Sequence, residues 1–339
     1  MTSKSRSRSS GRVNLDDIAD HVGVSRITVS RALSRPEKVS QATREKVEKA
    51  AQELGYVPDL VASSLASRRS GVIALILPTI TQALFADSVR GLSDVLGANG
   101  YQLVVGDSGY SESAEASLIA TMLGRRPDAI VLVGSQHTPE ARRLLGAARI
   151  PVVEIWELPD QPIDSAVGFS NHQAIKAMTE RLINDGHRHL GFLSVLGSNR
   201  AGARLEGFQA ALAEADLPAD AVVFPDTTEQ RLDSAVEFDR LRERHPDMDA
   251  LVCADDLIAI DVLFACLRRG IAVPDELAVT GFCDLDIAAR SWPSLSTVRV
   301  PAYQIGRESA RLILERLDGR SEQSVTVDLG FELIGRESG

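Results

Sequence analysis

The most informative segment is residues 13–58, which read VNLDDIADHVGVSRITVSRALSRPEKVSQATREKVEKAAQELGYVP. Apolar and small side chains recur in its first part at helical spacing, namely Ile18, Ala19, Val22, Val24, Val29, Ala32 and Leu33. Gly23 falls where the chain must turn sharply between two short helices, and Ser25 is well placed to cap the second of them. This pattern predicts two packed helices joined by a tight turn.

A third amphipathic helix is expected from about residue 41 to residue 54. Ser40 precedes it as a cap, and Gly55 and Pro58 end it. Three short helices then make one small core, which is the arrangement of a helix-turn-helix domain. In such a domain the first turns of the second helix would enter a DNA major groove, here with Arg26, Ile27, Thr28, Ser30 and Arg31.

Charge is distributed unevenly along the chain. Residues 1–70 hold 13 Lys and Arg against 8 Asp and Glu, whereas residues 71–339 hold 24 against 39. A polyanionic partner therefore belongs to the N-terminal part alone. Residues 1–12 contain four basic side chains among serines and almost no apolar ones, so we expect a disordered basic arm. This arm is either a DNA contact or a solvated tail.

Length and composition call for more than one domain. A chain of 339 residues with 44% hydrophobic content is expected to form two or three domains. An early signal-type apolar run and a bilayer-spanning apolar stretch are both missing from the sequence, which predicts a cytoplasmic protein without a membrane partner. The three cysteines, Cys253, Cys266 and Cys283, are far apart in apolar surroundings and are expected to be reduced core residues.

From residue 71 onward the pattern changes to alternating strands and helices. Apolar, β-branched runs that predict strands occur at 72–77, 102–105, 129–133, 151–155, 166–169, 189–195, 221–224, 250–253, 277–282 and 296–300. Amphipathic segments that predict helices include 85–99, 171–185, 203–215, 229–244, 256–269 and 302–317. About ten such units exceed one ordinary sheet, so we predict an α/β core of two doubly wound parallel-sheet subdomains with a cleft between them.

Catalytic and metal-binding patterns are absent from the sequence. It has no GxSxG, GxxxxGK[ST] or HExxH motif and no dinucleotide fingerprint, so an enzyme, a cofactor and a metal site are not expected. Asp255 and Asp256, like Asp284 and Asp286, follow predicted strands, where α/β sheets bind ligands. Each pair has two interpretations, as ligand acceptors or as acids that favour a helix N-terminus.

Ordered motifs along the whole chain resemble the LacI/GalR family of bacterial transcription regulators. They are VNLDDIA (13–19), GVS (23–25), TVSR (28–31), VS (39–40), LGYVP (54–58), ARLEGF (203–208), ADDLIA (254–259) and VTGF (279–282), and the segment from Val61 to Ala66 resembles the hinge helix of that family. The resemblance implies a periplasmic-binding-protein-like core and four parts: 1–12 as the arm, 13–59 as the DNA-binding domain, 60–70 as the hinge helix, and 71–339 as the effector-binding and dimerisation core. The two lobes of the core would be about 71–170 with 302–325, and 171–298 with 326–339.

The same resemblance implies a homodimer on a pseudo-palindromic DNA operator. It places Ser25, Arg26, Ile27, Thr28 and Arg31 in the major groove. It places Asn14, Ser40 and Tyr56 on phosphates. The hinge residues Ala62 and Leu65 would lie at the minor groove. We expect the hinge to become helical only on DNA, because it is short and rich in serine. A dimer is favoured over a tetramer, since the sequence ends five residues after Ile334 without a heptad segment.

Further segments resemble gluconate-utilisation repressors within this family: PTITQALFAD (78–87), VEIW (153–156) and GFSN (168–171). They imply a sugar acid, such as gluconate or its phosphate, as the small-molecule effector that releases the repressor from DNA. Arg204 would meet its carboxylate, and the other expected contacts are Thr79, Phe85, Trp156, Ser170, Asp255 and Asp284. Trp156 has the alternative role of a plain core residue, and the insertion of Cys283 before Asp284 departs from the family pattern.

Two other readings remain open from the sequence. A co-repressor-dependent or activating regulator would keep the DNA-binding half and change the sign of the effector response. A soluble sugar-binding protein or a sugar-converting enzyme would share the two-lobed core, but it would leave residues 1–70 unexplained.

Overall fold

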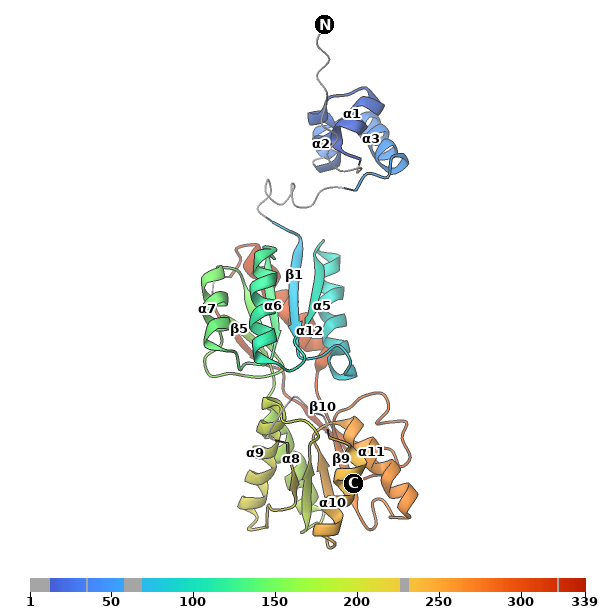
Figure 1. Cartoon of the computed structure of the whole chain (residues 1–339), viewed down its shortest axis with the longest axis vertical. Coiled ribbons are helices and arrows are strands. Elements are labelled where there is room, and N and C mark those ends of the chain that lie inside the picture. Colours follow the sequence, from blue (N-terminus) through green and yellow to red (C-terminus); the bar gives the residue numbers. More distant parts are fainter. Residues whose placement is uncertain (1–12, 35, 58–68, 226–231, 322) are drawn as a thin grey trace. The chain divides into compact units, whose positions relative to one another are not determined.

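The computed structural model describes residues 13–34, 36–57, 69–225, 232–321 and 323–339. The chain divides into two compact units, Met1–Ser70 and Gly71–Gly339 (Figure 1). The expected basic arm and most of the expected hinge helix, with Ala62 and Leu65, lie outside the described residues. Their predicted roles therefore stay predictions.

The N-terminal unit is a bundle of short helices around one core. Its elements are α1 (Leu15–Val22), α2 (Arg26–Ser34), a 3₁₀ turn (Pro36–Lys38) and α3 (Gln41–Glu53). The buried side chains come from all three α-helices and are Ile18, Ala19, Val29, Ala32, Val47, Ala50 and Ala51. The predicted helix-turn-helix architecture is confirmed, because the apolar and small residues that recur at helical spacing in the sequence pack together in this core.

Local signals set the ends of these helices. Gly23 adopts a φ of +72°, the left-handed conformation that ends α1. Glycine adopts this conformation at no steric cost because it has no Cβ. Ser25 Oγ accepts a hydrogen bond from the Thr28 amide at 3.1 Å and caps α2. Ser40 caps α3 in the same way, through the Thr43 amide. The predicted caps and turn are therefore present.

The first half of the core unit is a six-stranded parallel sheet. Its strand order is β11-β5-β4-β3-β1-β2, with β1 (Val72–Leu77), β2 (Gln102–Asp107), β3 (Ala129–Val133), β4 (Val152–Ile155), β5 (Ser165–Gly168) and β11 (Thr326–Asp328). The accompanying helices are a 3₁₀ turn (Ala83–Phe85), α5 (Ala86–Ala98), α6 (Glu112–Gly124), α7 (Pro139–Ala148) and α12 (Ala302–Leu317). We call this half the first lobe.

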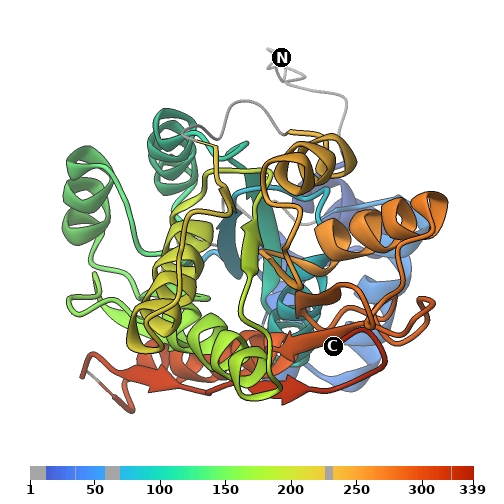
Figure 2. The same cartoon turned by 90° about the horizontal axis from the view of Figure 1, so that it is seen from below.

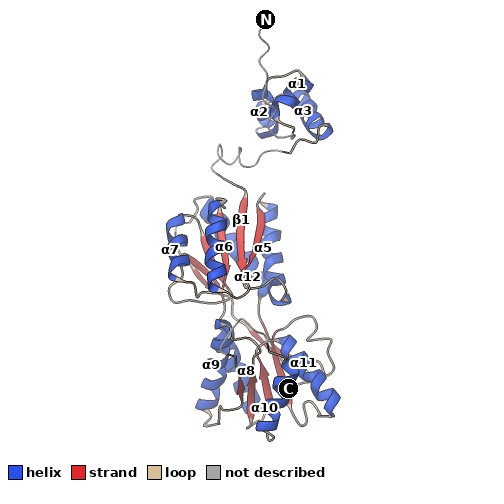
Figure 3. Cartoon of the chain, in the orientation of Figure 1, coloured by secondary structure: helices blue, strands red, loops and turns tan. Residues whose placement is uncertain are grey.

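The second lobe holds the other six-stranded sheet, ordered β12-β10-β9-β8-β6-β7. Its strands are β6 (Leu190–Leu193), β7 (Val222–Val223), β8 (Ala250–Cys253), β9 (Ala278–Cys283), β10 (Ser296–Arg299) and β12 (Glu332–Ile334). Its helices are α8 (Asn171–Asn184), α9 (Asn199–Glu214), α10 (Ser234–Arg244) and α11 (Asp256–Arg269). Figure 3 shows helices beside the strands of both lobes. The pairing is parallel except at β12, which runs antiparallel to β10. The described helices include none long and apolar enough to cross a membrane.

One predicted lobe boundary is wrong. We expected residues 326–339 in the second lobe, but β11 pairs in parallel with β5 of the first lobe, Thr326 opposite Ala166. The chain therefore crosses to the second sheet only after β11, and the red C-terminal segment can be followed from one sheet to the other in Figure 2. A three-residue edge strand carries too little apolar pattern to be assigned to a sheet from sequence.

Helix positions differ from the expected ranges in two ways. Helix α9 begins at Asn199 instead of 203, because Ser198 caps it through the Ala201 amide. Helices α6 and α7 were not among the predicted ranges. The sequence of α6, ESAEASLIATMLG, spreads its apolar residues around the helix, so it shows little of the one-sided pattern on which such predictions rest.

Helices α5 and α12 pack at van der Waals contact through glycine. A Cβ on Gly91 of α5 would overlap the backbone oxygen of Tyr303 in α12 and lie 3.0 Å from the Arg307 nitrogen. Gly306 of α12 has the same relation to Ser88 of α5. The Ser88 hydroxyl also donates a hydrogen bond to the Ala302 oxygen at 2.8 Å. This close approach packs α5 of the first lobe against α12, the helix that follows β10 of the second sheet.

We predict that Gly91→Ala lowers the free energy of unfolding by about 1–3 kcal/mol, because backbone atoms of α12 must move to admit the methyl group. Gly97→Ala on the same helix is the matched control. No heavy atom lies within 4 Å of a Cβ there, so alanine should be neutral or slightly stabilising. Urea denaturation measures both variants, and equal stability of the two would contradict the packing argument.

Candidate functional site

Helix α2 presents an exposed face that is suited to DNA. Ser25, Arg26, Ile27 and Arg31 are exposed, whereas Val29 on the opposite side is buried. Ile27 is 63% exposed, so this large apolar side chain makes little contribution to its own core. Arg26 has a surface ion pair to Asp16 at 3.6 Å, which a stronger phosphate or base contact can replace at low cost.

Two of the three residues expected on phosphates lie at helix starts, and the third, Tyr56, follows the end of α3. Asn14 caps α1, where its Oδ1 accepts from the Asp16 amide at 2.8 Å, and Asp17 Oδ2 accepts from the Asn14 amide at 2.9 Å. Ser40 caps α3, and Tyr56 is half-buried against the small core. Helix N-termini favour anions through their free amides and their dipole. Contact between these residues and DNA stays a prediction.

Within the core unit, a line of aromatic rings runs from the first lobe to the second. Phe85 stacks edge-on against Trp156 with ring centroids 5.2 Å apart, and Trp156 against Phe169 at 6.0 Å. Phe169 in turn lies 6.0 Å from Phe282 of β9. Trp156 is fully buried, and its Nε1 donates to Ser88 Oγ at 3.0 Å. We call these four residues the aromatic line.

The expected roles of Phe85 and Trp156 as effector contacts need correction. Their exposed fractions are 2% and 0%, so their ring faces are already covered by protein. The alternative interpretation of Trp156 as a core residue is the one that agrees with the structure.

Arg204 ends the aromatic line in the second lobe. Its guanidinium lies 3.7 Å from the centre of the Phe282 ring. Its Nε donates to Asn171 Oδ1 at 2.9 Å, and its Nη1 donates to the Ala254 oxygen at 2.6 Å. Burial lowers the pKa of Arg204 to about 10. Arg204 thus ties α9 to the start of α8 and the end of β8, and much of its hydrogen-bonding capacity is used inside the protein.

Three other expected effector residues take part in local backbone structure. Asp255 caps α11 by accepting from the Ile258 amide at 2.9 Å, and Ser170 caps α8 by accepting from the Gln173 amide at 3.1 Å. Thr79 Oγ1 accepts from the Thr81 amide at 3.1 Å. These three polar side chains therefore serve as helix and turn caps, and any ligand contact by them stays a prediction.

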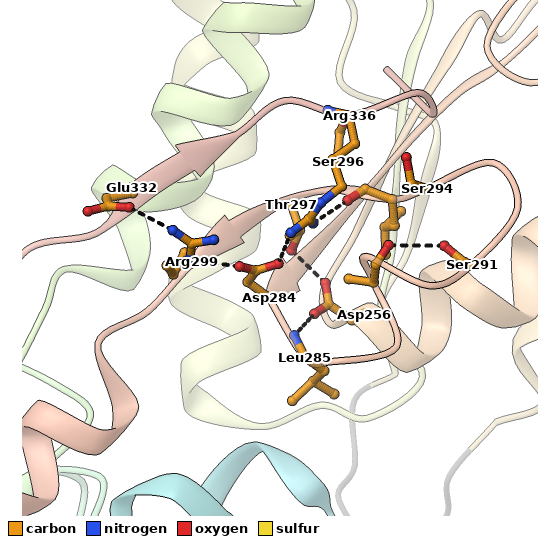
Figure 4. A network of polar contacts seen from close by, with 12 residues as sticks. Asp256, Asp284, Leu285, Ser291, Ser294, Ser296, Thr297, Arg299, Glu332 and Arg336 are labelled. Atoms are coloured by element: carbon orange, nitrogen blue, oxygen red, sulfur yellow. Dashed lines mark hydrogen bonds and ion pairs between the residues drawn. The ribbon is translucent and has the colours of Figure 1, made fainter.

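Asp284 does not fit its expected role as an effector contact. Its two oxygens form ion pairs at 2.6 Å with Arg336 and 2.7 Å with Arg299 (Figure 4). Arg299 also contacts Glu332 of β12 at 3.1 Å. This network joins the end of β9 to β10 and the C-terminal segment, so Asp284 serves the edge of the second sheet. Sequence could not show it, because the two arginines are distant along the chain.

Asp256, beside Asp255, is a buried structural carboxylate. It accepts from the Leu285 amide at 2.7 Å and from the Thr297 hydroxyl (Figure 4). Burial raises the pKa of Asp256 to about 6, against the opposing effect of these hydrogen bonds. It therefore connects α11 to β10 and to the turn after β9.

A cavity of about 490 Å³ opens between the lobes, a size that suits a sugar-sized ligand. The first lobe contributes the loops that follow β1, β2, β3 and β4, and the second lobe contributes residues 197–200 at the start of α9. Polar side chains on the wall include Ser108, Tyr110, Glu115, Ser135, Glu157 and Arg200. The described residues on this wall include none of the seven expected effector residues.

The missed residues share one signal. Strand ends β1 to β4 lie at the carboxyl edge of a parallel sheet, where α/β proteins bind ligands. We applied that rule to the strands before Asp255 and Asp284 and not to those of the first lobe. Ser108, Ser135 and Glu157 each follow a strand within two residues, so the same rule would have selected them. Arg200 had no such signal, because the expected helix began after it.

A buried histidine lies behind the cavity wall. The His137 ring is fully buried, with Nδ1 2.7 Å from Glu115 of α6 and Nε2 3.4 Å from Glu154 of β4. Arg142 of α7 lies 3.9 Å from the same Glu154 oxygen. Burial lowers the pKa of His137, but its hydrogen bond to Glu115 and the negative charges of Glu115 and Glu154 outweigh this and raise the pKa to about 9.

We predict that His137 stabilises the core in a pH-dependent manner. Because its folded pKa exceeds the unfolded value of 6.5, its contribution is complete below pH 6.5 and is lost as the pH rises through 9. The shift corresponds to about 3 kcal/mol. Urea denaturation of the wild type and of His137→Gln at pH 6.5 and pH 9.5 measures it. A stability difference that does not shrink at the higher pH would contradict this assignment.

Known proteins match both units of the chain. The family model for bacterial regulatory proteins of the lacI family matches residues 14–59, and the model for the periplasmic binding protein-like domain matches residues 179–339. The HTH-type transcriptional regulator GntR of Escherichia coli (strain K12) is 35% identical over 320 residues, 94% of this chain and 96% of that protein.

Solved structures agree with these matches. A LacI-family transcriptional regulator from Silicibacter pomeroyi superposes with a TM-score of 0.87 at 32% identity, over 96% of this chain and 99% of that one. The transcriptional regulator CelR in complex with cellobiose has a TM-score of 0.70 at 30% identity, over 97% and 100% of the two chains.

A helix-turn-helix unit followed by a two-lobed periplasmic-binding-protein-like core defines a DNA-binding transcriptional regulator. The matched relatives are regulators, and this chain is a regulator and not an enzyme. It belongs to the lacI family of bacterial regulatory proteins.

Proposed function

We propose that this chain is a repressor that binds a pseudo-palindromic operator as a homodimer and leaves it when a sugar acid occupies the cavity between the lobes. The observation that carries the effector half is the polar cavity of about 490 Å³ at the carboxyl ends of β1 to β4. The similarity to GntR and the resemblance of residues 78–87, 153–156 and 168–171 to gluconate-utilisation repressors support a sugar acid such as gluconate or its phosphate. A regulator of bacterial genes acts where the DNA is, in the cytoplasm.

The DNA-binding half of the proposal rests on the exposed face of α2. Arg26 offers a planar fork for a guanine, and Ile27 offers an apolar contact to a thymine methyl. Thr28 and Arg31 complete that face, while Asn14, Ser40 and Tyr56 hold the phosphates. Two copies are needed, because one small helix-turn-helix unit contacts too few base pairs to select a site. Leu65 in the hinge would open the minor groove between the two copies.

Exposed apolar side chains on the core support the second copy. Phe264 and Leu267 lie three residues apart on α11 and are 53% and 67% exposed. Val104 and Val105 are also exposed on β2, which is an edge strand of the first sheet. Apolar surface of this kind is typical of an interface between subunits.

We predict that Arg26→Ala weakens binding to the specific operator by about 10- to 100-fold, because one bidentate base contact is worth about 1–3 kcal/mol. The change should leave effector binding intact. Arg44→Ala is the control, since Arg44 is exposed on α3 and paired with Glu48. Fluorescence anisotropy with operator and random DNA measures both variants. Equal losses for the two DNAs would remove Arg26 from base reading.

Release by the effector follows from linkage. If the ligand favours a lobe arrangement that differs from the DNA-bound one, it lowers DNA affinity by the same factor by which DNA lowers ligand affinity. Such coupling is typically about 1–3 kcal/mol.

We predict that gluconate weakens operator binding by about 5- to 150-fold in a gel-shift titration with the full chain. Cellobiose and glucose are the neutral comparison ligands. Stronger DNA binding in the presence of gluconate would indicate a co-repressor-dependent regulator. A response to neutral sugars alone would reject the sugar-acid assignment and leave the DNA-binding function unaffected.

A further inference from the structure

Arg200 is a buried cation on the cavity wall that forms no ion pair with any of the described residues. It is the second residue of α9, its exposed fraction is 7%, and it lines the cavity. Its guanidinium carbon lies 5.3 Å from the ring centre of Phe85 in the first lobe. Within the described part of the chain, Arg200 makes no hydrogen bond or ion pair. Arg204, in contrast, is hydrogen-bonded and stacked.

An unpaired buried charge is costly unless a partner arrives. A second cation adds to the cost here, because the charge of Arg200 acts with burial to lower the pKa of Arg204. The strip of α9 that faces the cavity therefore favours a bound anion. Arg200 can supply it with two parallel N–H donors, the geometry that matches a carboxylate.

Glu157 lies beside the guanidinium, on the first lobe. A Cβ placed on Gly134 would be 3.5 Å from Arg200 Nη1 and 3.9 Å from Glu157 Oε1, so both groups border the same small space. The other oxygen, Glu157 Oε2, accepts from the Ser135 amide at 3.1 Å and from the Ser135 hydroxyl. These bonds fix the carboxylate through Oε2, and Oε1 accepts no hydrogen bond from the described residues. The Arg200 guanidinium and the Glu157 carboxylate thus lie on two sides of the space next to Gly134.

We propose that Arg200 binds the carboxylate of the effector while Glu157 accepts a hydrogen bond from the hydroxyl on the adjacent carbon, so that the site selects an α-hydroxy acid with a single anionic group. The inference rests on the proposed function and deepens it by separating the free sugar acid from its phosphate. Arg200 belongs to the second lobe and Glu157 to the first, so such a ligand would also bridge the two lobes.

The remaining charged wall residues disfavour a second anion. Glu112 and Glu115 are the other charged side chains among the described residues on the cavity wall, and both are carboxylates. The charge of Glu115 is already compensated by His137 at 2.7 Å. A phosphate group carries a charge of about −1.5 to −2 near pH 7 and would find carboxylates where it needs cations. The cavity therefore suits hydroxyl groups beyond the carboxylate end.

Isothermal titration calorimetry on the full chain tests the assignment, with gluconate, 6-phosphogluconate and the neutral polyol glucitol as probes. For the wild type we expect gluconate to bind at least about 10-fold more tightly than either of the others. Arg200→Met should weaken gluconate binding by about 10- to 100-fold, and Arg200→Lys by less, because it keeps the charge and loses the fork. Arg240→Met, at an exposed position of α10, is the matched control and should bind as the wild type does.

The outcomes distinguish failure of the proposed function from failure of the roles assigned to Arg200 and Glu157. If the wild type binds none of the sugar acids, the proposed function fails. If it binds gluconate and Arg200→Met binds it equally well, or if 6-phosphogluconate binds as tightly as gluconate, this assignment is overturned and the proposed function stands. Thermal unfolding reports whether Arg200→Met is folded. Should it not fold, the wild-type preference among the three probes and the loss of about 10-fold expected for Glu157→Gln decide the question.

Discussion

The contact between the two lobes through the aromatic line is the feature on which the rest of the core depends. Four rings from Phe85 to Phe282 pass from the first sheet to the second, and Arg204 closes the line. Aromatic contacts and a stacked guanidinium bury large areas and have preferred geometries, so they hold neighbouring elements in a defined arrangement. The start of α9, with Arg200, is thereby held against the strand ends of the first lobe, and a polar cavity remains beside the apolar line.

Polar residues at the strand ends have two different tasks. Asp255 and Ser170 accept hydrogen bonds from backbone amides, and Asp284 pairs with arginines of its own lobe. Arg200 and Glu157 line the cavity and retain hydrogen-bonding groups that a ligand can use. The difference lies in whether the protein already satisfies the group, since a satisfied carboxylate gains little from a ligand and an unsatisfied buried charge gains much. A ligand that contacts both lobes at this point would favour one arrangement of the lobes over another. An effector needs such a preference to change DNA affinity.

Several predictions made from sequence depended on neighbours close along the chain, and those were confirmed. The caps at Ser25 and Ser40 and the turn at Gly23 are set by residues within a few positions, so their physics is local. The positions of β1 to β10 followed from apolar, β-branched runs, whereas the short strands β11 and β12 were not among the predicted ranges. Arg204 was expected to contact the effector, and that role stays a prediction. Its partners Asn171 and Ala254 and its buried state were not visible in the sequence, because the partners come from segments 33 and 50 residues away.

By itself the sequence determined the helix-turn-helix unit, the two parallel sheets and the family, because apolar periodicity, capping residues and ordered motifs encode them within short stretches. Only the tertiary structure decided that β11 joins the first sheet, that Asp284 is held between two arginines, and that Arg200 lies buried on the cavity wall without an ion pair to any described residue. Each of these depends on which distant segments meet in space. A side chain's charge can be read from its letter, but whether that charge is already neutralised depends on the fold.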